Sequence, residues 1–215
     1  MTRIILIRHG QSQANAASLF AGLSDFDLTE LGHRQAALAA EYLRPREQVD
    51  RIYSSDLLRA YHTALPFGAA YGLPVEKDKG LREIFGGDWE RLSFPQIAEQ
   101  YPDAFDVWVN DYSHSRPVNG ESTEEVYRRV VPHICALAEE NDGKCILLAT
   151  HATVVRAFHA FAEGLRADET GSVPFAHNAS INLFSYEKGR AHPVSLNLVE
   201  HLGDGVTSLP FKPNA

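Results

Sequence analysis

The sequence has few cysteines and no long apolar runs. Its two cysteines among 215 residues are too few for the disulfide framework of a small secreted protein, and both lie among apolar residues, which predicts burial. No apolar stretch reaches the roughly 20 residues that a membrane-spanning helix needs. The first apolar run, residues 4–7, is also too short for the core of a signal peptide. We therefore expect a cytoplasmic protein without a membrane segment.

Positive charge is scarce as well. The chain has 20 Lys and Arg residues against 28 Asp and Glu residues, which gives a formal net charge of −8. A balance of that sign argues against nucleic acid and against anionic membranes as partners, although it permits a small local group of arginines. Hydrophobic residues make up 44% and charged residues 22% of the chain, which is typical of globular proteins. The length fits a single domain over residues 1–215.

Short apolar runs recur along the chain and end at polar or turn-forming residues. They are rich in β-branched and apolar side chains, which predicts buried strands. Near the end of the chain, a turn at residues 187–190 separates two further strand patterns and predicts a hairpin. The strand patterns cover residues 4–7, 51–54, 145–150, 181–186 and 192–199.

Helix signals alternate with these strands. Thr29 and Ser122 are good N-cap residues, and Ser122 opens a capping box with Glu125. Pro66 falls inside another helical pattern, where it is expected to bend the helix or mark its end. The helical patterns cover residues 30–43, 56–71, 123–138 and 152–161.

This alternation of strands and helices predicts an α/β fold. The terminal hairpin adds an antiparallel strand, so we expect a mostly parallel mixed sheet in a three-layer α/β/α sandwich. Residues 84–120 break the alternation, and we interpret them as a small helical cap inserted into the single domain.

Two of the predicted strands run directly into histidine. The first ends at Arg8, His9 and Gly10, and the third ends at His151. If these strands are parallel neighbours, both histidines reach the edge of the sheet where α/β proteins bind ligands. Arg8 adds a fork of donors, Gly10 permits close backbone approach, and the helix after His151 offers free N–H groups. Together these features predict a pocket for a tetrahedral oxyanion.

Further motifs follow in order over about residues 4–160, and with them the chain resembles the histidine phosphatase superfamily. That group includes cofactor-dependent phosphoglycerate mutases and many small-molecule phosphatases. Each motif alone is weakly specific, but their order makes the combined signal strong. The motifs are IRHGQSQAN at 7–15, FAG at 20–22, DLTELG at 27–32, QA at 35–36, SSDLLRAYHT at 54–63, LRE at 81–83, GDWE at 87–90, GES at 120–122, TH at 150–151 and Arg156.

The resemblance implies a metal-independent phosphomonoesterase that acts on a small phosphorylated metabolite and needs no cofactor. His9 would be the nucleophile and become a phosphohistidine. Arg8, Arg59 and His151 would hold the three non-bridging phosphoryl oxygens, and Glu83 would protonate the leaving oxygen before activating water. The remaining substrate-binding positions that the resemblance implies are Asn15, Gly22 and Ala152.

The chemistry of these residue types agrees with those roles. A neutral imidazole is available as a nucleophile near neutral pH, and arginine keeps its charge while it stabilises a transferring phosphoryl group. The sequence shows no cluster of Asp, Glu and His with metal-ligand spacing, so we expect no metal.

Departures from the mutase pattern favour the phosphatase branch. Ala21 stands where the mutases usually carry a substrate-contacting Thr, and the residues after Glu83 lack the mutases' basic and aromatic run. Residues 85–112 contain a single basic residue, Arg91, and seven aromatic residues, and sparse positive charge suits hydrolysis. A 2,3-bisphosphoglycerate-dependent phosphoglycerate mutase and a non-catalytic phospholigand-binding protein are the alternatives. The sequence identifies neither the substrate ester nor the oligomeric state.

Other polar and aromatic residues receive ordinary interpretations. Most aromatic residues of the cap are expected to form its core, with Phe85 and Trp89 as the better candidates for the pocket. His114 and His177 lie in predicted loops and could approach the site. We interpret Arg128 and Arg129 as solvated or ion-paired helix residues. The histidines for which we expect no catalytic role are His33, His62, His133, His159, His192 and His201.

Overall fold

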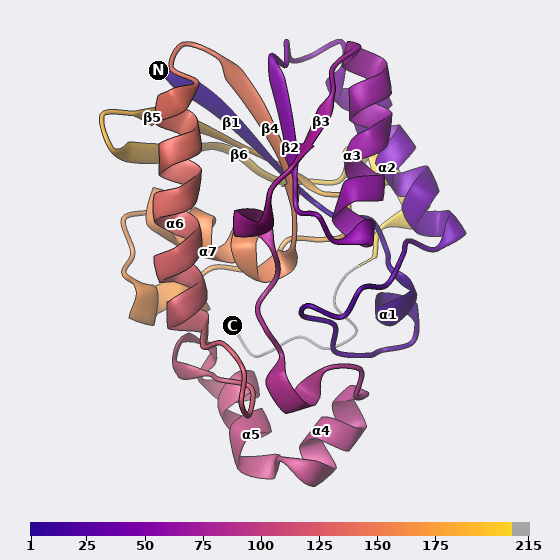
Figure 1. Ribbon diagram of the computed structural model, residues 1–215, viewed down its shortest axis with the longest axis vertical. Coiled ribbons are helices and arrows are strands. Elements are labelled where there is room, and N and C mark those ends of the chain that lie inside the picture. Colours follow the sequence, from indigo (N-terminus) through magenta and orange to yellow (C-terminus); the bar gives the residue numbers. More distant parts are fainter. Residues whose placement is uncertain (208–215) are drawn as a thin grey trace.

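The protein is built on one mixed β-sheet (Figure 1). The computed structural model describes residues 1–207, so residues 208–215 of the expected 1–215 domain lie outside it. Within the described range the sheet has six strands in the order β3-β2-β4-β1-β5-β6. The strands are β1 (Thr2–Arg8), β2 (Arg51–Ser54), β3 (Val75–Lys77), β4 (Cys145–Thr150), β5 (Ile181–Glu187) and β6 (Arg190–Leu198).

The strand directions confirm the mostly parallel mixed sheet. β1, β2, β3 and β4 run parallel, whereas β5 is antiparallel to both β1 and β6. β1 and β4 are direct neighbours, and their register pairs Arg8 with Thr150. The next residues along each chain segment, His9 and His151, therefore leave the sheet beside one another.

Helices cover both faces of the sheet, because apolar side chains alternate along its central strands. In β1, Ile5 and Ile7 belong to the core under α2 (Glu30–Leu43) and α3 (Leu58–Tyr71). Ile4 and Leu6 belong to the core under α6 (Thr123–Glu140) and α7 (Ala152–Ala162). The result is the expected α/β/α layering (Figure 1).

The helix ends follow the capping signals of the sequence. Thr29 accepts a hydrogen bond from the Gly32 N–H at the start of α2, and Ser122 forms its capping box with Glu125 at the start of α6. Helix α3 continues past Pro66 to Tyr71 and stops at Gly72, whose φ of 67° lies in the left-handed region. Pro66 therefore does not mark the end of that helix.

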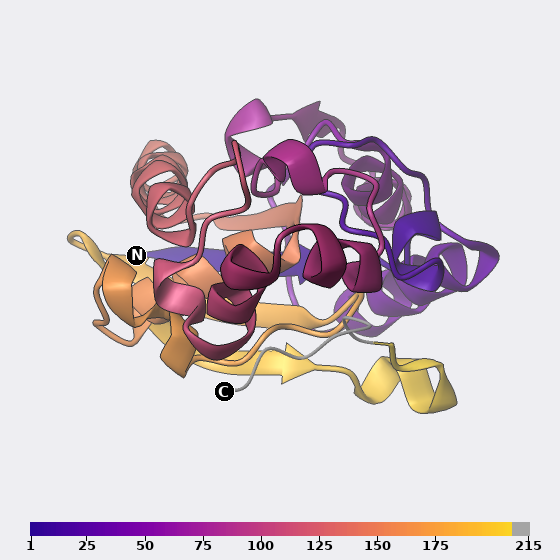
Figure 2. The same cartoon turned by 90° about the horizontal axis from the view of Figure 1, so that it is seen from below.

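Part of the segment between β3 and α6 lies beyond the carboxyl ends of β1 and β4. Its helices α4 (Phe94–Gln100) and α5 (Pro102–Asn110) occupy one end of the molecule in Figure 1 and face the viewer in Figure 2. The remaining short helices are α1 (Gln13–Ala16) and the 3-10 turns η1 (Lys79–Leu81), η2 (Gly87–Trp89), η3 (Tyr112–His114), η4 (Ala167–Ser172) and η5 (Glu200–Gly205).

In residues 1–207, no helix is long and apolar enough to cross a membrane. Both cysteines are free thiols; Cys145 is buried as predicted, whereas Cys135 is only half-buried.

Candidate active site

The ends of β1 and β4 bring two imidazole rings together. His9 and His151 have ring centroids 5.3 Å apart and an interplanar angle of 62°. His9 is 4% exposed and His151 is fully buried. His9 and His151 are far apart in the sequence but close in the fold, as predicted from their positions at the ends of two strands.

The backbone fixes which nitrogen of His9 is free. Its Nδ1 lies 2.7 Å from the Gly10 carbonyl oxygen, and because a carbonyl only accepts, Nδ1 must carry the hydrogen. Nε2 then carries the lone pair. Burial, reinforced by the positive charges of Arg59 and Arg8, holds the pKa of His9 well below its usual value, so the ring is neutral at pH 7.

His151 is oriented by a serine at the end of β2. Its Nε2 lies 2.8 Å from Ser55 Oγ, and that oxygen also accepts the Leu57 N–H at 3.4 Å. The serine hydroxyl has one proton, which it can donate to Nε2. In this arrangement Nδ1 of His151 carries a hydrogen, and it is a buried atom without a hydrogen-bond partner in the described structure. Burial, followed by the charge of Arg59, lowers the pKa of His151 strongly.

Two arginines with almost no solvent exposure flank the histidines. Arg8 donates from Nη1 to the Ala176 carbonyl at 2.7 Å, while its buried Nε has no partner among residues 1–207. Burial lowers the pKa of Arg8 to about 10, which still leaves it charged at pH 7. Arg59 is 1% exposed. Unpartnered buried donors of this kind indicate a place for an anion.

Arg59 is held by the loop that contains Gly22. Its guanidinium donates to the carbonyls of Ala21, Gly22 and Ser24 at 2.7–3.1 Å. The Gly22 N–H donates to Glu90, and a Cβ at Gly22 would meet the Ile84 carbonyl oxygen. Gly22 thus supports Arg59 through tight backbone packing and is not among the pocket-lining residues, and its expected role in substrate binding stays a prediction.

Glu83 reaches the same pocket from the segment after β3. Its Oε1 accepts hydrogen bonds from the Thr153 hydroxyl and from the Ile84 N–H. Both bonds reach one oxygen, which leaves Oε2 available for a proton. Arg129 donates to the Glu83 carbonyl and forms an ion pair with Glu121. Arg129 is thus ion-paired as expected, and it also braces the backbone beside Glu83.

The remaining polar residues of the site come from loops and from the start of α7. Asn15 accepts hydrogen bonds at Oδ1 from the Ser12 N–H and from the Asn178 amide, which directs its own amide donor elsewhere. Ala152 and Thr153, at the start of α7, line the pocket, where the helix N-terminus favours an anion. The supporting role of Asn178, which also donates to the His9 carbonyl, was missed because a lone loop asparagine gives no distinctive signal.

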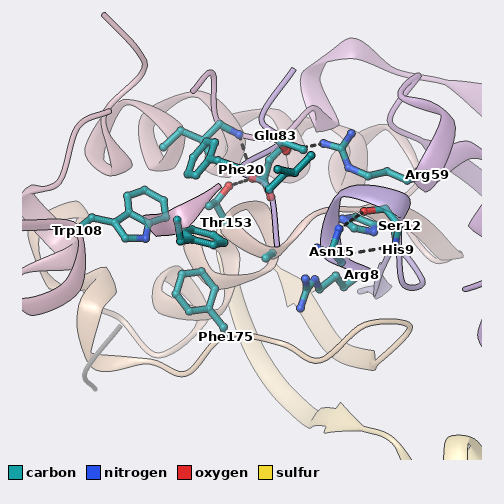
Figure 3. Close-up of a pocket in the computed structure, with 15 residues that line it drawn as sticks. Arg8, His9, Ser12, Asn15, Phe20, Arg59, Glu83, Trp108, Thr153 and Phe175 are labelled. Carbon is teal, nitrogen blue, oxygen red and sulfur yellow. Dashed lines mark hydrogen bonds between the residues drawn. The ribbon is translucent and has the colours of Figure 1, made fainter. Parts of the chain in front are cut away.

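A pocket joins these groups to a cluster of aromatic rings (Figure 3). It encloses about 610 Å³ of empty space, part of it open solvent. Phe85 is 42% exposed and Trp89 is buried behind the pocket, so the expectation that these two line it was wrong. The lining residues are Arg8, His9, Ser12, Asn15, Leu19, Phe20, Ala21, Arg59, Glu83, Ile84, Phe94, Trp108, Ala152, Thr153 and Phe175.

The other histidines lie away from the pocket lining. His114 is exposed and hydrogen-bonds Asp111, and neither it nor His177 lines the pocket. Elsewhere the fold places Asp27, His33 and His62 with possible ligand atoms within 4.8 Å of one another. The sequence showed no such cluster because its members come from a loop, α2 and α3. An Asp27–His62 contact of 2.5 Å accounts for part of this grouping.

His9, two buried arginines and a carboxyl group thus line one pocket, and the buried His151 packs against His9. A buried anion-binding site beside an unprotonated ring nitrogen can bind a phosphate ester and accept its phosphoryl group. Fold and site together define a phosphoryl-transfer enzyme of the α/β class.

Comparison with known proteins gives the family. The sequence profile of the histidine phosphatase superfamily (branch 1) matches residues 4–199. The chain belongs to this superfamily, and it is a phosphatase.

Named relatives cover nearly the whole chain. It is 33% identical to phosphoserine phosphatase 1 of Hydrogenobacter thermophilus over 204 residues, 95% of this chain and 96% of that protein. The structure of mycobacterial glucosyl-3-phosphoglycerate phosphatase with VO3 has a TM-score of 0.84 and 34% identity, covering 92% and 99% of the two chains. The α-ribazole phosphatase of Shigella flexneri has a TM-score of 0.81 and 30% identity, covering 91% and 96%.

Proposed function

We propose that this phosphatase hydrolyses the monoester of a small phosphorylated metabolite through a phosphohistidine on Nε2 of His9. The observation that carries the proposal is the hydrogen bond from His9 Nδ1 to the Gly10 carbonyl. It leaves the Nε2 lone pair as the nucleophile at the buried end of the pocket. The lowered pKa of His9, which results mainly from burial, keeps that nitrogen unprotonated.

In the first step, the Nε2 lone pair attacks phosphorus and the bond from phosphorus to the ester oxygen breaks. Protonated Glu83 donates its proton to the departing oxygen, so that an alcohol leaves. The free Oε2 suits this transfer, because Thr153 and the Ile84 N–H both bind Oε1.

In the second step, water attacks the phosphohistidine on phosphorus. Glu83, now ionised, takes the proton of that water, and the bond between Nε2 and phosphorus breaks. Inorganic phosphate leaves, His9 is again neutral and Glu83 is again protonated, so the cycle closes without another reactant.

The charge of the transferring group is balanced by the protein itself. Arg8, Arg59 and His151 would hold the three non-bridging oxygens, with Asn15 and the Ala152 N–H as further donors. The unpartnered Arg8 Nε and His151 Nδ1 support this arrangement, because buried donors normally have an acceptor. In this scheme no metal is required.

The charges that line the pocket favour hydrolysis over the mutase reaction. A mutase must hold a carboxylated substrate and shield the phosphohistidine from water. Among the pocket-lining residues, Arg8 and Arg59 are the only cationic side chains, and both lie at the phosphate end.

We also propose that residues 84–120 form a cap over this pocket within one domain. The cytoplasmic location and the lack of a nucleic-acid partner stay predictions.

The direct test compares phosphate release with isomerisation. Wild-type protein should release phosphate from 4-nitrophenyl phosphate, and His9→Ala should lower kcat by at least about 10³-fold, the scale of losing a nucleophile. With 3-phosphoglycerate and 2,3-bisphosphoglycerate, isomerisation faster than phosphate release would reverse the preference for hydrolysis.

A further inference from the structure

The aromatic half of the pocket points to the kind of alcohol that the enzyme releases. We infer that the preferred leaving group is uncharged and bears a ring or an apolar chain, and that Phe20, Phe94, Trp108 and Phe175 select it. These four residues are called the aromatic wall below. The inference rests on the proposed function, because it names the substrate class of the same site.

The aromatic wall and the phosphate-binding groups occupy different sides of the pocket. In Figure 3, Trp108 and Phe175 lie to one side of Glu83, and Arg8, His9 and Arg59 lie to the other. Glu83, the proposed proton donor to the leaving oxygen, therefore stands between them. An ester bound with its phosphorus at His9 would extend its alcohol toward the aromatic wall.

The rings of the wall are fixed by edge-to-face contacts. Phe20 lies 5.4 Å from Trp108 and 6.3 Å from Phe94, measured between ring centroids. Behind them the buried ring of Trp89 packs 5.5 Å from Phe20 and 5.6 Å from Trp108. Packing of this kind holds aromatic rings in defined orientations, so the apolar surface exists before a substrate binds.

A buried arginine secures the far end of the wall. The Arg156 guanidinium carbon lies 4.1 Å from the ring centroids of both Tyr112 and Phe175. Arg156 also donates to the carbonyls of Thr170 and Gly171. Its Nη1 is a buried atom without a hydrogen-bond partner among residues 1–207, but Arg156 does not line the pocket. It stands behind Phe175 and orients that ring.

The charges of the pocket disfavour a carboxylate on the alcohol. Its charged lining residues are Arg8, Arg59 and Glu83, and Arg59 already donates to three backbone carbonyls. A substrate carboxylate against the aromatic wall would be removed from water with no cation among the lining residues on that side of the pocket, and it would approach Glu83. An unpaired buried charge is strongly unfavourable.

The inference therefore separates this chain from two of its named relatives. Phosphoserine and glucosyl-3-phosphoglycerate, the compounds in those names, both carry a carboxylate. A ring-bearing alcohol without charge fits the lining better, since it buries apolar surface against the wall and leaves no charge unpaired.

The test compares kcat/KM for aliphatic monoesters, so that a good phenolic leaving group does not bias the result. The probes are 2-phenylethyl phosphate, ethyl phosphate, O-phosphoserine, 3-phosphoglycerate and phosphocholine. We expect 2-phenylethyl phosphate to exceed the two carboxylated esters by about 100-fold or more, the scale on which a site with unmatched polar groups discriminates.

Variants then assign the preference to the wall. Trp108→Ala should lower kcat/KM for 2-phenylethyl phosphate by about 10-fold or more, the loss expected for a large apolar contact, and change ethyl phosphate turnover far less. Phe94→Ala, at the first residue of α4, should act in the same direction if Trp108→Ala fails to fold. Phe85→Ala is the matched control, because its ring is exposed and outside the pocket, and it should change neither value.

Each contrary outcome has a distinct meaning. O-Phosphoserine or 3-phosphoglycerate turned over as well as 2-phenylethyl phosphate would overturn the inference and leave the phosphatase reaction intact. A preference for phosphocholine would also overturn it, since the rings would then select a cation through their π faces. If no ester is hydrolysed and His9 is never phosphorylated, the proposed function itself fails.

Discussion

The imidazole rings of His9 and His151 lie with centroids 5.3 Å apart at the ends of the adjacent parallel strands β1 and β4. Each ring is held through a different nitrogen: His9 through Nδ1 to a backbone carbonyl, and His151 through Nε2 to Ser55. The pair therefore offers an unprotonated nitrogen on His9 and, when Ser55 donates to His151, an N–H donor on Nδ1 of His151. A nucleophile and a group that stabilises the phosphoryl oxygens need these complementary states.

The first prediction concerns the charge of individual histidines. Burial lowers the pKa values of His9 and His151 well below 6.5, whereas a hydrogen bond to Asp78 raises the pKa of His133. At pH 6.5 in the absence of phosphate, His9 and His151 should be neutral and His133 more than half protonated. Histidine ring ¹⁵N chemical shifts, recorded across a pH titration, measure all three in one sample.

His133 is the internal control for that titration, because its expected direction is opposite. His9→Gln and His151→Asn assign the two buried signals. A His9 signal that titrates at or above pH 6.5 would contradict the neutral nucleophile.

The second prediction concerns Gly10, whose backbone packs against α2. A Cβ at this position would lie 2.5 Å from the Gly32 carbonyl oxygen, a backbone atom that cannot move aside cheaply. Gly10→Ala should lower the free energy of unfolding by about 2–4 kcal/mol, the range of severe overpacking, and should displace His9. Urea unfolding measures the change. Gly205→Ala is the control, because its nearest neighbour would be a Leu31 side-chain atom at 3.7 Å.

The third prediction concerns Glu90, which organises the loop around Arg59. Its carboxylate accepts hydrogen bonds from the N–H groups of Gly22, Leu23, Ser24 and Gly86. Glu90→Gln places an amide donor against some of these donors. It should reduce stability by about 2–3 kcal/mol, the scale of lost charge-assisted bonds, and should lower kcat/KM because the carbonyls that hold Arg59 shift. Glu99→Gln, on the exposed side of α4, should leave both urea unfolding and kcat/KM unchanged.

The fourth prediction concerns metal removal. Because the scheme assigns phosphoryl charge to Arg8, Arg59 and His151, dialysis against EDTA should leave kcat with 2-phenylethyl phosphate unchanged within about twofold. Metal content is measured on the same dialysed sample. Activity lost with EDTA and restored by a divalent cation would show that the two arginines and His151 are insufficient.

Much of the fold follows from local patterns in the sequence. Short stretches of sequence determine the strands and the helix starts, so these can be predicted without the structure. Examples are the apolar runs of β1 and β4 and the capping residues Thr29 and Ser122. The neighbourhood of His9 and His151 follows from one further rule, that parallel strands end at a common edge.

The errors concern relations that no local pattern records. Phe85 and Trp89 were the better candidates for the pocket among the cap aromatics, but the chain turns so that Phe85 is exposed and Trp89 packs behind the wall. Phe20 and Phe175 enter the pocket from distant loops. The support that the Gly22 carbonyl gives to Arg59 is likewise a contact between distant segments.

The most direct test of the central claim identifies the phosphorylated atom. The enzyme is mixed with a ³²P-labelled monoester and quenched in alkali, in which phosphohistidine survives, and the labelled peptide is then mapped by mass spectrometry and ³¹P NMR. The account predicts label on Nε2 of His9, formed and discharged at least as fast as kcat and absent from His9→Ala. Label on another residue, or undiminished turnover by His9→Ala, would contradict it.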